Sequence, residues 1–114
     1  YCSGAVHGSH GLLQWPFRAW GASLVLAGHE HVYERLSVAG FPYVVNGLGG
    51  NALYAFATAL GGSELRFNAA NGALLVSADA DSLRLQMLTT DDTVVDEYVL
   101  PRGGVLCCTA QYIG

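Results

Sequence analysis

Hydrophobic residues along the chain fall into short runs that are separated by glycine-rich or polar turns. A continuous apolar run predicts a strand covered on both faces, whereas alternation predicts one solvated face. The stretch SLVLA, residues 23–27, is apolar apart from its first residue, so we expect a strand buried on both faces. Gly28 ends this run and places the next residues at the carboxyl end of the strand. Ligands bind at that end in open α/β sheets.

The segment before this strand predicts a loop followed by one short helix. Residues 1–11 are rich in glycine, serine and histidine and show no hydrophobic period. Apolar side chains are frequent over residues 12–20, where we expect a buried helix. Pro16 is compatible with an early helical turn, and Gly21 provides a stop. The aromatic side chains that we assign to the core are Trp15, Phe17 and Trp20.

From residue 36 onward the pattern predicts β structure. The expected strands are residues 36–38, 42–46, 63–68, 73–78, 82–88 and 94–100. Ala39-Gly40 predicts a hairpin turn, residues 47–50 a tight glycine loop, and residues 51–62 an irregular surface segment. The last four strands predict an antiparallel meander, because residues 83–87 alternate apolar and polar side chains. Residues 101–114 receive no assignment.

The composition is that of a core-forming domain with an unusually uncharged surface. Hydrophobic residues make up 52% of the 114 residues and charged residues 12%, against about 25% charged in an average globular domain. We therefore expect another segment to cover part of the surface, with a weakly charged extracellular domain as the alternative. The net charge is −4, and no basic patch indicates a nucleic-acid partner. No apolar run is long enough for a membrane span, and the first residues lack the pattern of a signal peptide.

Three cysteines, Cys2, Cys107 and Cys108, lie at opposite ends of the chain and match no zinc-knuckle spacing. We expect free buried thiols. A bridge from Cys2 to one of the adjacent pair stays open, because it requires the two ends of the chain to meet.

All four histidines lie within the first 31 residues, and His29 and His31 form a His-x-His pair. In an extended segment, side chains at i and i+2 share one face with Cα atoms roughly 6.5–7 Å apart. That spacing suits two metal ions about 3.5–4 Å apart, each taking one imidazole, or a single ion if the chain turns sharply. Glu30 is expected to point away and is not assigned as a ligand. A surface turn that happens to contain two histidines is the alternative.

A family resemblance rests first on the segment LVLAGHEHVYER, residues 24–35, and on PYVVNGLGG, residues 42–50. Together they resemble the last motif block of calcineurin-like metallophosphoesterases, in particular the purple acid phosphatase and tartrate-resistant acid phosphatase branch. YCSGAVHG, residues 1–8, resembles the segment that follows a metal-binding histidine in this family. Shorter matches are QWPF (14–17), WGA (20–22), NGA (71–73) and VVDEY (94–98). The resemblance covers residues 1–100.

The resemblance implies an α/β fold, of which this chain supplies the C-terminal half of a four-layer sandwich, mostly antiparallel β with one short N-terminal helix. It also implies a phosphomonoester hydrolase with two metal ions, iron with zinc, manganese or iron, in which a metal-activated hydroxide attacks phosphorus. His29 would bind the divalent ion, His31 the ferric ion, and His7 would contact the substrate phosphate or protonate the leaving group. Asn46 could contact substrate, or it could shape the adjoining loop. The family is secreted, periplasmic or lysosomal.

Departures from the family pattern concern the acidic metal ligands. The earlier Asp-x-His, Gly-Asp and Gly-Asn-His blocks are absent, and no aspartate precedes His29. The aspartates expected to be solvated instead are Asp79, Asp81, Asp91, Asp92 and Asp96. We therefore expect this chain to be inactive or only weakly metal-binding by itself, with the missing N-terminal part of the same domain as its partner.

Other residues near the histidines receive structural roles. We expect His10 to be a surface residue at a helix start, and Glu34 and Arg35 to join ion pairs. Two alternatives to the phosphatase remain: a non-catalytic β-rich module with a vestigial motif, and a cupin-like mononuclear metal protein. The cupin alternative fits less well, because Glu34 and Gly40 follow the histidines at closer spacing than cupins use.

Overall fold

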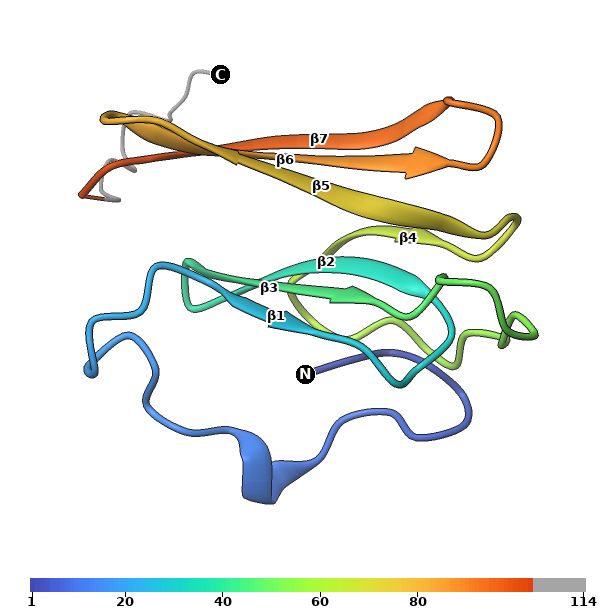
Figure 1. Ribbon diagram of the computed structural model, residues 1–114. Helices are drawn as coiled ribbons and strands as arrows, with labels where there is room; N and C mark the ends of the chain where they lie inside the picture. The colour runs from blue at the N-terminus through green and yellow to red at the C-terminus, as the bar shows by residue number, and fades with distance from the viewer. Residues whose placement is uncertain (104–114) are drawn as a thin grey trace. The chain divides into compact units, whose positions relative to one another are not determined.

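A computed structural model describes residues 1–103, which form seven strands and one short 3₁₀ turn (Figure 1). The chain divides into two compact units, Tyr1–Ala73 and a second that begins at Leu74. Over residues 1–103 there is no α-helix, and hence no helix able to cross a membrane. The elements are η1 (Gly11–Leu13), β1 (Val25–Ala27), β2 (Tyr33–Val38), β3 (Phe41–Asn46), β4 (Ser63–Phe67), β5 (Gly72–Ala78), β6 (Ser82–Thr89) and β7 (Val94–Pro101).

The first sheet has the order β1-β3-β2-β4 and is mixed. β1 runs parallel to β3, with Val25 opposite Tyr43, while β2 is antiparallel to both β3 and β4. The buried apolar side chains of the first unit include Val32, Tyr33, Leu36, Val44 and Leu48. Because β1 and β3 are parallel, their carboxyl ends meet at one edge of the sheet, as a ligand site in an α/β protein requires.

The hairpin between β2 and β3 confirms the turn predicted at Ala39-Gly40. Both residues have positive φ, 51° at Ala39 and 74° at Gly40. Two consecutive left-handed residues are the conformation of the two-residue turns that match the twist of antiparallel strands. Gly62 packs against this hairpin so closely that a Cβ there would lie 2.3 Å from the carbonyl oxygen of Ser37.

The second sheet has the order β5-β6-β7, and β6 and β7 pair in antiparallel register from Ser82 opposite Pro101. Side-chain burial alternates along β6, as predicted for residues 83–87. The exposed face carries an ion pair between Arg84 and Glu97, 2.5 Å between Nη2 and Oε2. Strands were predicted correctly in this region, but the single meander was wrong, because β4 pairs with β2 in the first sheet.

Aspartates close the turns on either side of β6. Backbone N–H groups of Asp81 and Ser82 donate to Asp79 and hold the pKa of its carboxyl below the usual range. The hydroxyl of Thr89 does the same for Asp91. Both carboxyls are solvent-exposed, as expected, whereas Asp96 is buried and the prediction that it is solvated was wrong.

The helix predicted over residues 12–20 is absent, and only the 3₁₀ turn Gly11–Leu13 forms. Trp15 and Trp20 are 51% and 64% exposed, so their assignment to the core was also wrong. The physical reason is Pro16, which has no N–H to donate and disfavours the helical conformation of the residue before it. Trp15, Phe17 and Trp20 instead contact one another, with ring centroids 5.8–6.0 Å apart.

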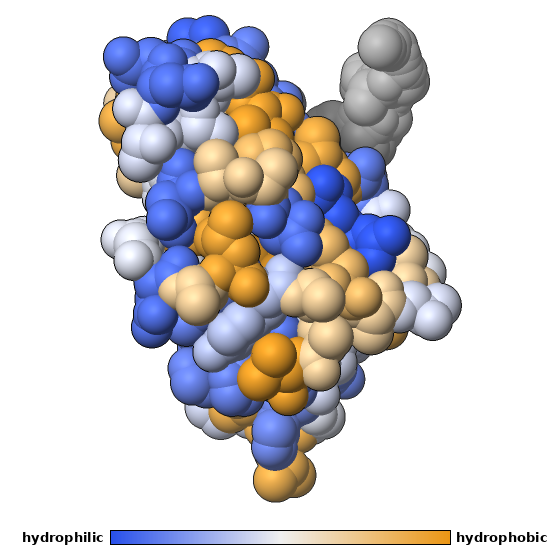
Figure 2. Space-filling model, turned by 90° about the vertical axis from the view of Figure 1, so that its right-hand side faces the viewer, coloured by the Kyte–Doolittle hydropathy of each residue, from blue (hydrophilic) through white to orange (hydrophobic). Residues whose placement is uncertain are grey.

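β1 is shorter and more exposed than the continuous apolar run predicted. It comprises only Val25–Ala27, and Leu26 is 51% exposed. In the described part of the chain β1 is an edge strand that pairs with β3 alone, so the expected burial on both faces was wrong. Hydrophobic residues elsewhere on the surface lie in groups separated by hydrophilic ones (Figure 2).

Candidate functional site

The two histidines of the His-x-His pair follow β1 in a bend, at the sheet edge where β1 and β3 end. His29 has φ 76°, and the N–H of Val32 donates to the carbonyl oxygen of Glu30 at 2.7 Å. The segment is therefore folded back on itself rather than extended. The expected position at a strand's carboxyl end is confirmed, whereas the extended geometry that would place both rings on one face is wrong.

His31 is held by its own neighbours in a defined orientation. Its Nδ1 lies 2.7 Å from the carbonyl oxygen of Ala52, and its ring stacks on Tyr54 with centroids 4.1 Å apart. A carbonyl oxygen only accepts hydrogen bonds, so Nδ1 carries the proton and the neutral ring has its lone pair on Nε2. Metal-binding histidines commonly donate one ring N–H to a carbonyl in this way.

His7 joins the same cluster from the N-terminal segment. Its ring stacks on His29 with centroids 4.0 Å apart and an interplanar angle of 24°, and its centroid lies 6.1 Å from that of Tyr54. His7 and His31, from segments far apart in sequence, thus both contact Tyr54, and His29 joins them through its contact with His7. Tyr54 was not identified from the sequence, because it lies in the irregular segment that carries no periodic signal.

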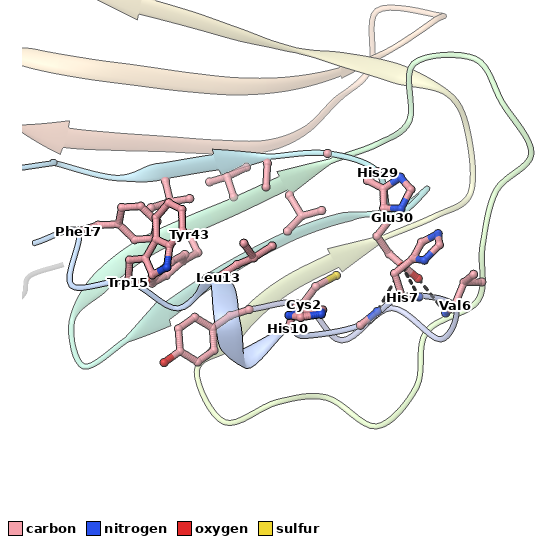
Figure 3. A pocket seen from close by; sticks show the side chains of 17 residues that line it. Cys2, Val6, His7, His10, Leu13, Trp15, Phe17, His29, Glu30 and Tyr43 are labelled. Carbon is pink, nitrogen blue, oxygen red and sulfur yellow. Dashed lines mark hydrogen bonds between the residues drawn. The ribbon is translucent and has the colours of Figure 1, made fainter.

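Glu30 fastens the loop that carries His7. The residue is 2% exposed, and its carboxylate accepts N–H bonds from Val6 at 3.0 Å, His7 at 2.7 Å and Gly8 at 3.3 Å (Figure 3). The carboxylate is tightly enclosed: a Cβ at Gly4 would lie 2.1 Å from Oε1. Glu30 is therefore an anchor of the backbone, a role that its position between two histidines did not reveal.

The backbone of Glu30 is equally constrained. A Cβ at Gly47 would lie 2.0 Å from the carbonyl oxygen of Glu30, so the loop after β3 approaches this residue closely. Glycine is the only residue that fits without a shift of the backbone.

Glu34 fastens the residues that precede this loop. It is fully buried and accepts bonds from the Ser3 N–H at 2.5 Å, the Ser3 hydroxyl at 2.6 Å and the Ser63 hydroxyl at 2.7 Å. These bonds join the N-terminal segment to β2 and β4. The ion pair expected for Arg35 is confirmed with Glu64 as its partner, whereas Glu34 bonds to Ser3 and Ser63 instead of forming the ion pair expected for it.

A pocket of about 620 Å³ lies between the N-terminal segment and one face of the first sheet (Figure 3). His7, His29 and Glu30 lie at one end of it, and Trp15, Phe17 and Tyr43 at the other. Its lining residues are Tyr1, Cys2, Val6, His7, Gly8, His10, Leu13, Trp15, Phe17, Val25, Ala27, Gly28, His29, Glu30, Tyr43, Val44 and Val45.

Two further residues considered from the sequence lie close to this site. His10 is exposed, precedes η1 and lines the pocket, which agrees with the expected surface position. Asn46 ends β3, lies outside the pocket lining, and its Oδ1 accepts the N–H of Leu48 at 3.4 Å. The structure thus shows the loop-shaping contact of Asn46.

Cys2 is a buried free thiol in the wall of the pocket, as expected. Burial raises its pKa from 9.0 to about 11. Cys107 and Cys108 lie outside the described residues.

The histidine cluster offers imidazole nitrogens but few acidic ligands. Within residues 1–103, no three or more His, Cys, Asp or Glu side chains are grouped so that they could hold one metal ion. The nearest carboxylate in sequence, Glu30, is occupied by backbone N–H groups. Of the two histidines predicted as ligands, His31 has its ring oriented by the carbonyl oxygen of Ala52, an arrangement that metal-binding histidines also show.

Comparison with known proteins does not assign this chain to a family. No protein-family model matches this chain, and no curated protein sequence does. The resemblance carried by residues 24–35 stays a prediction.

Proposed function

We propose that this chain is part of a dinuclear-metal phosphomonoesterase of the calcineurin-like, purple acid phosphatase type. It would contribute the C-terminal half of a four-layer α/β sandwich. The observation that carries the proposal is the gathering of His7, His29 and His31 at the edge where the parallel strands β1 and β3 end. Ligand sites of α/β sheets lie at such edges.

His29 and His31 would hold the two metal ions. When bound, such a metal pair supplies an activated water and stabilises charge on the transferring phosphoryl group. The bond from His31 to Ala52 supports this role, because it leaves Nε2 as the nitrogen with a free lone pair. The acidic ligands would come from the N-terminal part of the same domain, and this chain by itself would bind metal only partially.

His7 would contact the substrate phosphate and donate a proton to the leaving oxygen. Imidazole is suited to this task because it gains and loses a proton near neutral pH. The backbone bonds to Glu30 hold the His7 loop in place, while the ring stays exposed beside His29. Asn46 would act at the same edge, where its amide could also reach substrate.

Zinc binding by the purified chain tests the proposal. We expect a weak Zn²⁺ site by isothermal titration calorimetry, and His29→Ala or His31→Ala should weaken it at least about tenfold. His10→Ala is the matched control, since His10 is an exposed histidine outside the stacked cluster. Equal loss in all three variants, or no binding by the wild type, would contradict the proposal.

A second measurement tests whether the chain is only part of the site. We expect no hydrolysis of a chromogenic phosphomonoester, with or without iron, zinc or manganese. Turnover that His29→Ala abolishes would refute the expected incompleteness while supporting the phosphatase.

A non-catalytic β-rich module is the second candidate. It is favoured by the lack of a grouped set of three metal-binding side chains over residues 1–103. A folded chain that binds neither zinc nor phosphate would support this candidate instead.

A further inference from the structure

The chain between β3 and β4 is a long loop (Figure 1), and its first half supports His31 from two sides. The carbonyl oxygen of Ala52 accepts the His31 ring N–H at 2.7 Å, and the Tyr54 ring stacks on the imidazole. The backbone N–H of Tyr54 also donates to the carbonyl oxygen of His31 at 3.0 Å. Residues 48–54, which we call the supporting loop, form no strand of their own. The support of His31 therefore depends on bonds that hold this loop from outside.

Two asparagine side chains that follow β4 hold the supporting loop in place. The side-chain nitrogen of Asn68 donates to the carbonyl oxygen of Tyr54 at 2.7 Å. In the amide orientation that pairs donors with acceptors, the side-chain nitrogen of Asn71 donates to the carbonyl oxygens of Leu48 at 3.1 Å and Asn51 at 3.2 Å. Asn71 therefore fastens the loop at two points.

An amide is required at Asn71, because both of its partners are acceptors. A carbonyl oxygen cannot donate a hydrogen bond, and an ionised carboxylate also only accepts. Aspartate has the shape of asparagine, but it would place a negative oxygen where the nitrogen of Asn71 faces Leu48 and Asn51. Two hydrogen bonds would become repulsive contacts, and the supporting loop would lose this attachment.

The residue after Asn71 makes its amide chemically vulnerable. Gly72 has no side chain to hinder its backbone nitrogen, which can attack the side-chain carbonyl carbon of Asn71. A bond then forms between that nitrogen and Cγ, the bond from Cγ to the amide nitrogen breaks, and ammonia leaves with the proton of the Gly72 N–H. Water opens the resulting cyclic imide and produces aspartate or isoaspartate.

Both reacting groups are engaged in the folded chain. The Gly72 N–H donates to the carbonyl oxygen of Leu48 at 2.9 Å, the same oxygen that accepts the Asn71 amide. The reaction therefore requires this contact to open. Local opening costs less in a loop than between paired strands.

A second Asn-Gly pair, Asn46-Gly47, provides an internal comparison. Asn46 lies on β3, an inner strand of the first sheet, and is paired with Tyr33 of β2. The Gly47 N–H donates to the carbonyl oxygen of Val32 at 3.0 Å. Opening at this pair would separate β2 from β3, so we expect Asn46 to react more slowly than Asn71.

We propose that Asn71 is a deamidation site and that its conversion to aspartate releases the ring of His31. Asn71 is then a positioning residue, which acts on the imidazole through Ala52 and Tyr54. As a statement about regulation of the metal site this rests on the proposed function, whereas the chemistry at Asn71 does not. The modified chain would bind metal more weakly, so the site would decline with the age of the protein.

Peptide mapping by mass spectrometry tests the chemistry. One sample of the chain is kept folded in mildly alkaline buffer, and a second is kept in urea. In urea the two Asn-Gly pairs should deamidate at similar rates. In the folded chain Asn71 should react at least about tenfold faster than Asn46. Equal rates in the folded chain, or a faster reaction at Asn46, would overturn the proposal.

Two aspartate variants test the consequence for His31 in the absence of metal. Asn71→Asp reproduces the product, and Asn51→Asp is the matched control, because the Asn51 side chain accepts the N–H of Ala52 at 2.7 Å and a carboxylate can do the same. In Asn71→Asp we expect hydrogen exchange at the Tyr54 amide to be at least about tenfold faster. The ¹⁵N shifts of the His31 ring should show a mixture of tautomers in place of one. Asn51→Asp should behave as the wild type, and the same result in both variants would overturn the proposal.

Zinc titration separates this inference from the proposed function. We expect Asn71→Asp to bind Zn²⁺ about tenfold more weakly than the wild type and Asn51→Asp to bind it equally well. If the wild type binds zinc and Asn71→Asp does so equally well, the regulation is overturned while the phosphatase stands. If the wild type binds no zinc, the proposed function fails, and hydrogen exchange and the His31 tautomer still decide whether Asn71 holds the loop. Should Asn71→Asp not fold, the deamidated form separated from the aged folded chain by ion exchange takes its place.

Discussion

Two buried glutamates, Glu30 and Glu34, hold the N-terminal segment on the first sheet. Each accepts three hydrogen bonds, and in both cases the donors include backbone N–H groups of residues 3–8. Buried carboxylates are costly unless they are satisfied in this way. The position of His7 beside His29 therefore depends on Glu30, whose carboxylate bonds to the backbone of residues 6–8.

Replacement of Glu30 tests this dependence. Glu30→Ala leaves three backbone donors without their acceptor, so we expect the free energy of unfolding to fall by about 2–4 kcal/mol. Urea denaturation measures the fall, and hydrogen exchange should show faster exchange at residues 6–8. Glu64→Ala is the control, since the Glu64 side chain is 44% exposed and we expect its ion pair with the partly buried Arg35 to contribute about 1 kcal/mol or less. Similar losses in the two variants would contradict the anchoring role.

The thiol of Cys2 provides a pH-dependent prediction. Because its pKa is raised from 9.0 to about 11, burial of the neutral thiol stabilises the fold fully below pH 9. That contribution is lost as the pH rises toward 11, where the unfolded thiol ionises more readily.

We expect Cys2 at pH 8 to react with a disulfide reagent about a hundredfold more slowly in the folded chain than in denaturant, because less thiolate is present. The measurement uses a Cys107→Ser, Cys108→Ser double variant, in which Cys2 is the sole thiol. Equal rates in the folded and denatured chain would show that Cys2 is not protected.

The individual site residues could be predicted from the sequence only where a local motif marks them. His29 and His31 follow an apolar run and a glycine, and the structure places them at the end of β1. Tyr54 and the anchoring role of Glu30 arise from contacts between segments more than 20 positions apart. Local hydrophobic patterns contain no information about such contacts.

At the scale of elements, alternation and turn residues predicted the strands well. The strands β3 to β7 lie where the pattern indicated, and β2 extends three residues further toward the N-terminus than predicted. Two-residue periodicity and glycine turns act locally, which is why they locate strands. The helix predicted over residues 12–20 does not form, since Pro16 disfavours a helix there despite the apolar composition of the segment. The prediction that β4 belongs to one meander with β5, β6 and β7 was also wrong. β4 pairs with β2, which is distant in sequence, and local patterns do not determine such a pairing.

The β2–β3 turn offers a way to stabilise this sheet. Ala39 has φ 51°, a conformation that costs a residue with a Cβ about 1 kcal/mol relative to glycine. We expect Ala39→Gly to raise the free energy of unfolding by up to about 1 kcal/mol, because relief of this strain exceeds the added chain entropy. Ala59→Gly, in an exposed segment without positive φ, should be neutral or destabilising in the same urea experiment. A lower stability for Ala39→Gly would show that the turn is not strained.

At the scale of the whole molecule, low charge coincides with large apolar side chains on the surface. Only 12% of residues are charged, and the net charge of −4 falls to zero near pH 5.3. Leu12 is 79% exposed and Trp20 is 64% exposed. Exposed apolar groups promote association when charge repulsion is small.

We therefore expect self-association to be at least about tenfold stronger at pH 5.3 than at pH 8, because net charge opposes contact between copies. Sedimentation velocity over a concentration series measures the effect. A Leu12→Ser, Trp20→Ser double variant should associate less, whereas Thr58→Ser, a change at another exposed position, should behave as the wild type. Stronger association at pH 8 would rule out charge as the controlling factor.

The close approach of Gly4 and Gly47 to Glu30 has an evolutionary consequence. Gly4 faces the side chain of Glu30, whereas Gly47 faces its backbone. A natural variant with a small residue at position 30 would therefore free position 4 to carry a larger side chain, but position 47 would stay restricted to glycine. Positions 4 and 30 should covary among orthologues, and position 47 should be invariant wherever the bend after β1 is retained.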